Sequence, residues 1–161
     1  MFFRRIFLIK IIFLITISCG KSKITLSEID IVYEENQMLF KKNSKRYNGL
    51  VFEYYNNKQI KVEINVVNGL KEGALKQYYD NGILQTSLNF KKGMIDGKFI
   101  SYYQSGQKQV ITFYKNNLRN GSLEEFYENG RLKKCGNYFR GEKIGEFKQF
   151  FKSGGVATTF Y

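Results

Sequence analysis

Few side chains in this sequence have the type and spacing that catalysis needs. The 161 residues include no histidine, which excludes Ser-His-Asp and Cys-His catalysis and imidazole metal ligands. A glycosidase uses two carboxylates about 5–10 Å apart in a cleft. The carboxylates that recur along this chain fall in or beside predicted turns, where we expect them to be solvated: Asp80, Glu128, Glu72 and Asp96. We therefore predict no enzymatic activity, no metal site and no cofactor.

Cys19 is the one residue for which the sequence predicts a covalent modification. Residues 1–18 combine a basic start with a short apolar stretch, the pattern of a secretory signal peptide. Lys10 interrupts the apolar stretch too early for a transmembrane helix, which needs about 20 apolar residues. The segment Thr16-Ile17-Ser18-Cys19-Gly20 resembles the lipobox of bacterial lipoproteins. That resemblance implies a lipid on Cys19 and a membrane-anchored protein of the bacterial cell envelope. The alternatives are a plain signal peptide or an uncleaved anchor with an incidental cysteine.

The charge of the chain is strongly positive. Its 26 Lys and Arg against 14 Asp and Glu give +12, and removal of the signal peptide leaves 23 basic residues and a charge of +9. An exported protein rarely meets nucleic acid, so we expect anionic lipid, lipopolysaccharide or an acidic protein as the counterpart. A lipidated Cys19 would leave Cys135, the other cysteine, without a disulfide partner, and we expect Cys135 to be a half-buried strand residue.

The remainder of the chain repeats with a period of 24 residues, and such a fixed period indicates a repeat architecture. Two glycine series that we expect at turns have this period: Gly49, Gly73, Gly97, Gly121 and Gly145, then Gly82, Gly106, Gly130 and Gly154. A less regular third series is Gly69, Gly93 and Gly141, with Asn117. Aromatic pairs supply a first column of Tyr54, Tyr78, Tyr102, Phe126 and Phe150, and a second column of Tyr55, Tyr79, Tyr103, Tyr127 and Phe151.

One unit of the repeat reads as a β-hairpin. Residues 74–79 end in aromatic residues that favour strands. Asn81-Gly82 follows, and Asn-Gly predicts a type I′ turn with positive φ at both central residues. Residues 84–90 then alternate apolar and polar, as a strand with one apolar face does. Lys91-Lys92-Gly93 predicts the second turn.

The repeat therefore predicts an all-β fold, an antiparallel up-and-down meander of stacked hairpins in one extended, twisted sheet of eleven or twelve strands. We expect the repeat domain to span residues 29–161 and to follow a tether at residues 19–28. Its start reads as a degenerate half-unit, in which residues 29–33 form a strand, Asn36-Gln37 turn and residues 38–40 return. Residues 41–46 read as a basic loop.

The repeat motif is specific enough to suggest a family. Gly73–Leu84 and Gly121–Leu132 carry it most faithfully, as Gly-x-Leu-x-x-(Tyr/Phe)-Tyr-x-Asn-Gly-x-Leu. Gly97–Lys108 and Gly145–Val156 have Ser-Gly in place of Asn-Gly, and Gly49–Ile60 lacks the turn glycine. This pattern resembles the variant MORN repeat and is similar to the bacterial YwqK-type family of toxin–antitoxin antitoxins. The second resemblance implies an antitoxin or immunity protein that neutralises a cognate toxin by direct binding.

The aromatic columns are the candidate binding surface. Adjacent strand residues face opposite sides of a sheet, so each pair places one ring on each face. We expect one column to form core and the other to be exposed as a protein-binding stripe, with packing of both columns as the alternative. Basic residues gather in the turns between hairpins, and if those turns share an edge they would form a positive rim toward anionic lipid: Lys91, Lys92, Lys115, Arg119, Arg140, Lys143 and residues 41–46. The sequence thus predicts a lipid-anchored, non-enzymatic binding or scaffold module, with the antitoxin as the alternative and the oligomeric state open.

Overall fold

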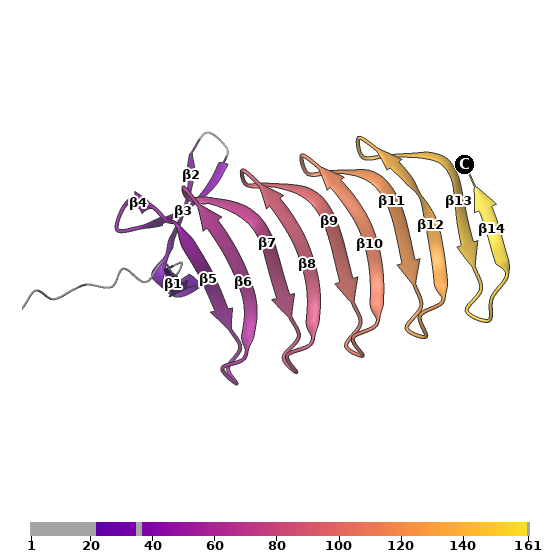
Figure 1. Cartoon of the computed structure of the whole chain (residues 1–161), viewed down its shortest axis with the longest axis horizontal. Coiled ribbons are helices and arrows are strands. Elements are labelled where there is room, and N and C mark those ends of the chain that lie inside the picture. The colour runs from indigo at the N-terminus through magenta and orange to yellow at the C-terminus, as the bar shows by residue number, and fades with distance from the viewer. Residues whose placement is uncertain (1–21, 35–36, 161) are drawn as a thin grey trace, which may run out of the picture.

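The computed structural model describes residues 22–34 and 37–160, and within them it confirms the all-β prediction (Figure 1). The predicted signal peptide and Cys19 lie outside the described residues. An eleven-stranded sheet has the order β1-β5-β6-β7-β8-β9-β10-β11-β12-β13-β14. Its strands are β1 (Lys23–Thr25), β5 (Gly49–Tyr54), β6 (Ile60–Val67), β7 (Leu70–Tyr78), β8 (Leu84–Lys91), β9 (Met94–Tyr102), β10 (Lys108–Lys115), β11 (Leu118–Phe126), β12 (Leu132–Phe139), β13 (Glu142–Phe150) and β14 (Val156–Phe160).

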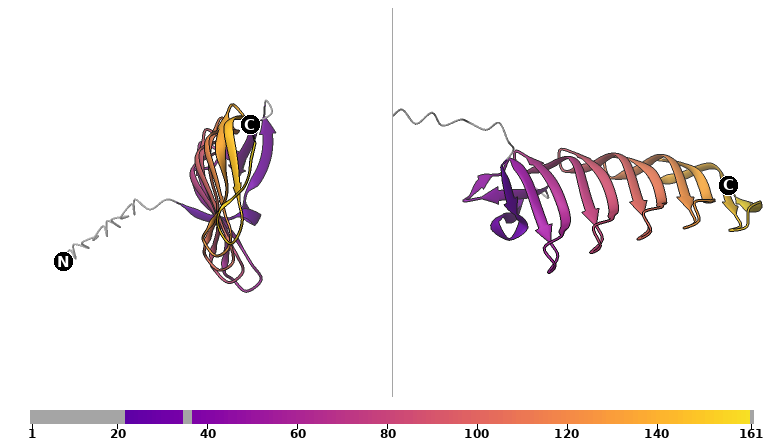
Figure 2. Two further views of the ribbon diagram at one scale, coloured as in Figure 1. Left: turned by 90° about the vertical axis from the view of Figure 1, so that its right-hand side faces the viewer. Right: turned by 60° about the horizontal axis from the view of Figure 1, so that its bottom comes forward.

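From β5 onward each strand pairs antiparallel with the next along the chain, so the up-and-down meander is confirmed. The sheet is a single elongated layer that twists along its length (Figure 2). The sole helical element in the described residues is the 3-10 turn η1 (Leu26–Glu28). Within the same residues, no helix has the length and apolarity to cross a membrane.

The two ends of the hairpins use different turns, and the prediction of turn type was wrong for one of them. The turn between β7 and β8 lies at the lower edge in Figure 1. In it, Tyr79 O accepts from Gly82 N at 2.9 Å, and Tyr79 N donates to Ile83 O at 2.8 Å. Gly82 has a φ of 82°, whereas the φ of Asn81 is negative. This is a three-residue loop with a glycine bulge, not a two-residue type I′ turn. Type I′ geometry occurs at the upper edge instead, where both central residues of Lys92-Gly93 have positive φ (49° and 82°).

The glycine series that begins at Gly49 lies inside strands, so its assignment to turns was wrong. In the pairing of β6 with β7, Ile64 faces Leu75 and Val66 faces Lys71, so a bulge around Gly73 interrupts the register. Gly73 has φ 76° there. Only glycine adopts this conformation readily inside a strand, which explains the strict period of the series.

The N-terminal region departs from the simple meander. Residues 23–25, predicted as part of a tether, form β1 and pair in parallel with β5 at the edge of the large sheet. The predicted leading hairpin is present as β2 (Asp30–Glu34) and β3 (Gln37–Lys42), with residues 35–36 outside the description. The predicted basic loop is instead the end of β3 and the short β4 (Lys45–Arg46). These three strands form a separate sheet that is not part of the repeat sheet.

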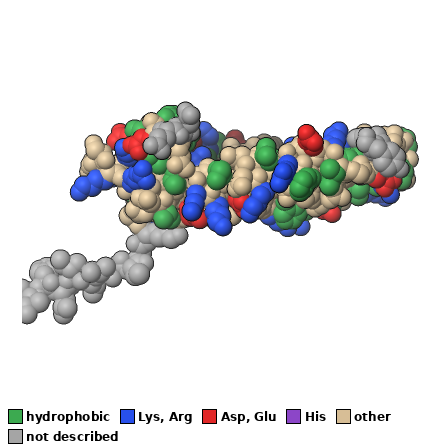
Figure 3. Space-filling view, turned by 90° about the horizontal axis from the view of Figure 1, so that it is seen from above, with side chains coloured by type: hydrophobic (Ala, Val, Ile, Leu, Met, Phe, Trp, Pro, Cys, Tyr) green, Lys and Arg blue, Asp and Glu red, His purple; other side chains and the backbone are tan. Residues whose placement is uncertain are grey.

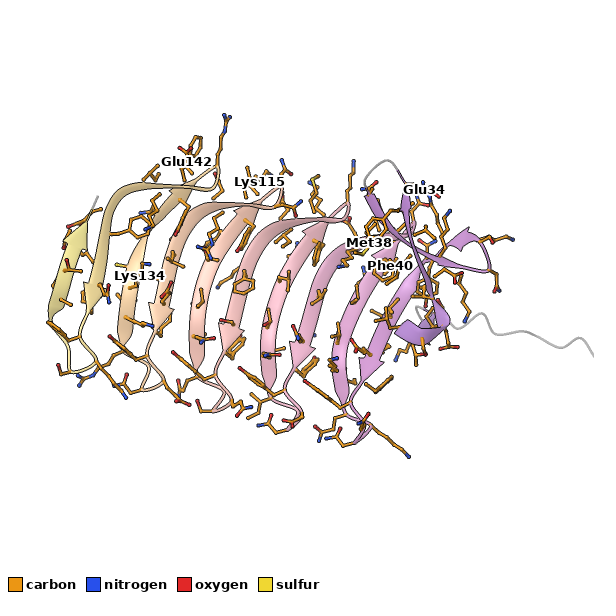
Figure 4. The ribbon with its side chains drawn as sticks, turned by 180° about the vertical axis from the view of Figure 1, so that it is seen from behind. Glu34, Met38, Phe40, Lys115, Lys134 and Glu142 are labelled. Carbon is orange, nitrogen blue, oxygen red and sulfur yellow. The ribbon has the colours of Figure 1, made fainter. Side chains whose placement is uncertain are left out.

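The small sheet covers the first units of one face of the large sheet, as the view from behind shows with Met38 and Phe40 (Figure 4). Phe40 packs with Val51, Ile64 and Val66 in one hydrophobic cluster. Ion pairs link the three strands of the small sheet, because Lys41 of β3 and Arg46 of β4 both pair with Glu34 of β2. These bonds, with that from Lys41 first, hold the pKa of the Glu34 carboxyl below its usual value.

We call the two sides of the large sheet the packed face and the open face. The packed face carries Val51, Leu75, Leu123 and Phe147, and the open face carries Phe52, Tyr54, Tyr102 and Phe126. Facing residues of successive strands form a row across the packed face: Val51, Ile64, Leu75, Leu88, Phe99, Thr112 and Leu123. Most buried side chains of the large sheet belong to the packed face, and Val51, Leu123 and Phe147 are at most 1% exposed.

Candidate binding surfaces

The second aromatic column is a structural ladder. Each of its tyrosine hydroxyls donates to a backbone carbonyl at the end of the descending strand in the next unit: Tyr55 to Tyr78 O at 2.7 Å, and Tyr79 to Tyr102 O, Tyr103 to Phe126 O and Tyr127 to Phe150 O, each at 2.8 Å. The four bonds span the same 23-residue separation. Because each hydroxyl joins one lower turn to the next, the column fixes the spacing of the units.

The last member of this column lacks the hydroxyl. Phe151 is 57% exposed, and among the described residues no further lower turn follows it that could accept a bond. A tyrosine thus stands where an acceptor follows, and a phenylalanine where none does. Asparagine side chains reinforce the ladder, since Asn57 Nδ2 donates to Asp80 O at 3.0 Å.

The first aromatic column lies on the open face, and it does not form the buried core. Tyr54 is 46% exposed, while Tyr78, Tyr102, Phe126 and Phe150 are half-buried. The facing residues of the ascending strands are apolar in four units, which extends the strip there: Ile60, Leu84, Leu132 and Val156. In the remaining unit, Lys108 faces Tyr102. The expectation that one column is core was therefore wrong, because the side chains of the strand interiors on the packed face supply the core.

The open face is hollowed between neighbouring members of the first column. A shallow depression of about 470 Å³ lies between Tyr102 and Phe126, with Ile111 and Glu124 among its lining residues. Ile111 and Glu124 face each other across β10 and β11. The depression offers two aromatic walls, the Glu124 carboxylate and the Lys108 ammonium group, which suits contact with a partner surface that carries both apolar and polar groups.

Two of the four carboxylates considered for catalysis have structural partners, and the other two are exposed. Glu72 Oε2 accepts from Lys92 N at 2.7 Å and so supports an upper turn. Asp96 pairs with Lys115 Nζ at 3.4 Å. Asp80 and Glu128 lie exposed in lower turns. Over the residues that the structure describes, no group of three His, Cys, Asp or Glu side chains could hold a metal ion.

The basic residues of the turns between the repeat hairpins share the upper edge, which was the condition for a positive rim, whereas residues 41–46 belong to the small sheet. Lys92 and Arg140 lie in upper turns, and Lys115, Arg119 and Lys143 lie at the strand ends beside such turns. Seen from above, cationic side chains mix with hydrophobic ones along this edge (Figure 3). The exposed hydrophobic residues of the edge include Val67, Met94, Leu118 and Phe139.

A third aromatic series was missed by reasoning from the sequence. Phe90, Tyr114 and Tyr138 are 24 residues apart on the packed face, and each faces a bulge glycine of the neighbouring strand: Gly73, Gly97 and Gly121. Rings pack well over residues that lack a side chain, so this row covers the sheet next to its upper edge. The fixed separation from the glycine series was a signal that could have revealed it. Cys135 is half-buried in β12, as predicted.

Comparison with known protein families gives a clear result. Four segments of the chain, residues 47–68, 71–92, 95–116 and 119–139, match the family model described as MORN repeat variant. Each of the four spans all or nearly all of one descending strand, its lower turn and the ascending strand that follows. Together they cover more than half of the chain. No curated protein matched the sequence.

Proposed function

This chain belongs to the MORN repeat variant family, and from that membership we propose that it is a non-enzymatic scaffold that binds a protein partner through its open face, at the bacterial cell envelope and anchored by a lipid on Cys19. Proteins built from MORN repeats commonly act as protein- or membrane-binding modules. The observation that carries the proposal is the first aromatic column, which lies half-exposed on a face whose opposite side is already packed.

Two physical properties favour the open face as a binding surface. Aromatic side chains dominate the energetics of protein interfaces because they bury a large area at a small cost in conformational entropy. The tyrosine ladder also fixes the units relative to one another before a partner arrives. A pre-organised surface binds more tightly because less freedom is lost on association.

The test compares affinity capture with two variants of the tagged full chain expressed in its native bacterium. The open-face variant carries Tyr102→Ala and Phe126→Ala, which remove both walls of the depression. The control carries Met94→Ala and Leu118→Ala, two exposed apolar side chains of the upper edge. We expect a protein retained by the wild type to be lost from the open-face variant and kept by the control. Equal retention by both variants would contradict the proposal.

The lipid anchor has its own test. Cys19→Ala should move the chain from the membrane fraction to the soluble fraction, because the acyl chains would then have no attachment point. Metabolic labelling with a clickable fatty acid should mark the wild type and leave Cys19→Ala unlabelled. Unchanged membrane retention of Cys19→Ala, with the signal segment still present, would contradict lipid anchoring.

The antitoxin role implied by the family resemblance is a more specific form of the same binding function. It requires a neighbouring gene whose product is toxic alone and harmless when this chain is present. The same open-face variant should then fail to protect, while Met94→Ala with Leu118→Ala protects. A neighbouring gene that is harmless when expressed alone would exclude this role.

A further inference from the structure

An arginine on the packed face is held by two tyrosines beside the upper turn between β10 and β11. Arg119 faces Tyr114 across β10 and β11. Its Nε donates to Tyr114 Oη at 3.4 Å, and its Nη1 donates to Tyr138 Oη at 3.3 Å. Its guanidinium carbon also lies 5.2 Å from the centre of the Tyr138 ring. The tyrosines thus determine the position of the guanidinium.

Within the residues that the structure describes, no carboxylate forms an ion pair with Arg119. Asp96, on the neighbouring strand β9, pairs with Lys115 instead. The hydrogen bonds with Tyr114, followed by those with Tyr138, raise the pKa of the Arg119 guanidinium, which is fully charged at neutral pH in any case. The structure therefore holds a positioned cation that its own acidic residues do not neutralise.

The two hydroxyls add hydrogen-bond donors to this cation. Each accepts a bond from the guanidinium and keeps its own hydrogen to donate. Arginine has five N–H groups, of which these two bonds use one each. Lys143 faces Tyr138 on the other side, with its Nζ 5.2 Å from the centre of the Phe147 ring. The exposed guanidinium of Arg119 therefore lies close to two other kinds of donor, the tyrosine hydroxyls and the Lys143 ammonium group.

This arrangement is particular to one place in the repeat. One unit earlier, Ile95 occupies the position of Arg119 and faces Phe90. Two units earlier the position holds Lys71, which lies 5.9 Å from the ring of Phe40 in the small sheet and is partly buried. One unit later the position holds Lys143, which faces Tyr138 from the other side. Among these units, a cation with two tyrosine hydroxyls around it therefore occurs at Arg119 and is not repeated in every unit.

We propose that Arg119, Tyr114 and Tyr138 form a binding site for a phosphoryl group, with Lys143 beside it. A phosphoryl group presents three or more oxygens in different directions, which fits donors that come from a guanidinium and two phenols. A carboxylate presents two oxygens in one plane and would leave part of this donor set unused. The site is on the packed face, so the inference does not depend on the binding function proposed for the open face.

The test measures binding to the full chain by isothermal titration calorimetry, with inorganic phosphate as the soluble probe and phosphatidylcholine vesicles with and without phosphatidylglycerol as the lipid probe. Arg119→Gln removes the cation, and Tyr138→Phe removes one hydroxyl while keeping the ring. Lys92→Gln is the control, because it removes the same charge from an exposed position in a neighbouring upper turn. Circular dichroism establishes that each variant is folded.

We expect saturable phosphate binding that Arg119→Gln weakens about tenfold or more and Tyr138→Phe weakens by a smaller factor. Lys92→Gln should change it less than about twofold, as expected of a distant exposed charge. If only phosphatidylglycerol vesicles bind, with the same order of the variants, the phosphoryl group is that of a lipid. Absence of binding to both probes, or equal weakening by Arg119→Gln and Lys92→Gln, would overturn the proposal.

Discussion

The two faces of the large sheet are built from alternating residues of the same strands, yet they differ in how they are completed. On the packed face, Leu123, Tyr138 and Phe147 cover one another, and the small N-terminal sheet covers the first units. On the open face, the central row contains Glu63, Lys76 and Ser87 and continues through Ile100 and Ile111. The aromatic rings of the first column stand beside this row, and most of them are half-exposed. The packed face thus provides the hydrophobic core of a single-layer protein.

The contrast explains how one layer of hairpins is stable without a second full sheet. A β-sheet must bury one apolar face to be stable, and the packed face does so with its own large side chains and the bulge glycines beneath them. The open face is then free of that requirement. Most aromatic rings of its first column remain half-exposed, which is why we assign the proposed partner to this face.

The largest expected effect is a difference in the free energy of unfolding between a variant of the packed face and a variant of the open face. Phe147→Ala removes a ring that is 0% exposed and should lower the free energy of unfolding by about 3–5 kcal/mol. Phe126→Ala, on the open face, should cost less than half as much because its ring is already partly exposed. Urea denaturation followed by circular dichroism measures both. Equal losses would mean that the two faces share the core.

A second test uses the close packing of Gly136 against Phe147 on the packed face. Gly136 faces the Phe147 ring, and a methyl group at this position would overlap that ring. Gly136→Ala should therefore destabilise the chain by about 1–3 kcal/mol, as overpacking of a core does. The double variant Gly136→Ala with Phe147→Leu should recover part of the loss. A neutral Gly136→Ala would show that the packed face is looser than described.

A third test concerns the tyrosine ladder that links the lower turns of successive units. Tyr103→Phe removes one hydroxyl that bonds to Phe126 O and should cost about 1 kcal/mol. Phe151→Tyr is the matched control, since it adds a hydroxyl where the described chain offers no following lower turn, and it should change stability little. Thermal unfolding of both variants measures the difference. A gain from Phe151→Tyr equal to the loss from Tyr103→Phe would contradict the ladder.

The smallest expected effect comes from polar residues in the central row of the open face. Lys76→Ala and Ser87→Ala should each change the free energy of unfolding by no more than about 0.5 kcal/mol, because they remove no buried contact. Leu88→Ala, a neighbour of Ser87 on the packed face, should cost clearly more. Chemical denaturation of the three variants checks this, and a large loss from Lys76→Ala would remove the contrast between the faces.

Much of the fold was predictable from the sequence because the 24-residue period fixes both the strand lengths and their order. The finer geometry was not. Asn81-Gly82 has the composition of a type I′ turn, but the bonds of Tyr79 select a three-residue loop. Gly73 looks like a turn residue, although it marks a bulge, because positive φ is needed in both settings.

The candidate site was predictable only in its residue types. Both aromatic columns were identified, but the role of Tyr103 depends on a hydroxyl that reaches the next unit, and no local pattern encodes that contact. The covering of Val51 and Ile64 by Phe40 likewise joins segments that are distant in the sequence. Arg119 was identified as a basic turn residue, whereas its bond to Tyr138 depends on the sheet register.

The most direct test of the central claim places a photoreactive benzoylphenylalanine at position 102 or at position 99 of the full chain, expressed in its native cells. Both residues are half-buried aromatics of β9, with Tyr102 on the open face and Phe99 on the packed face. If the open face binds the partner, irradiation gives a specific crosslinked product from position 102 and none from position 99. A product from position 99 alone, or none from either position, would contradict the account.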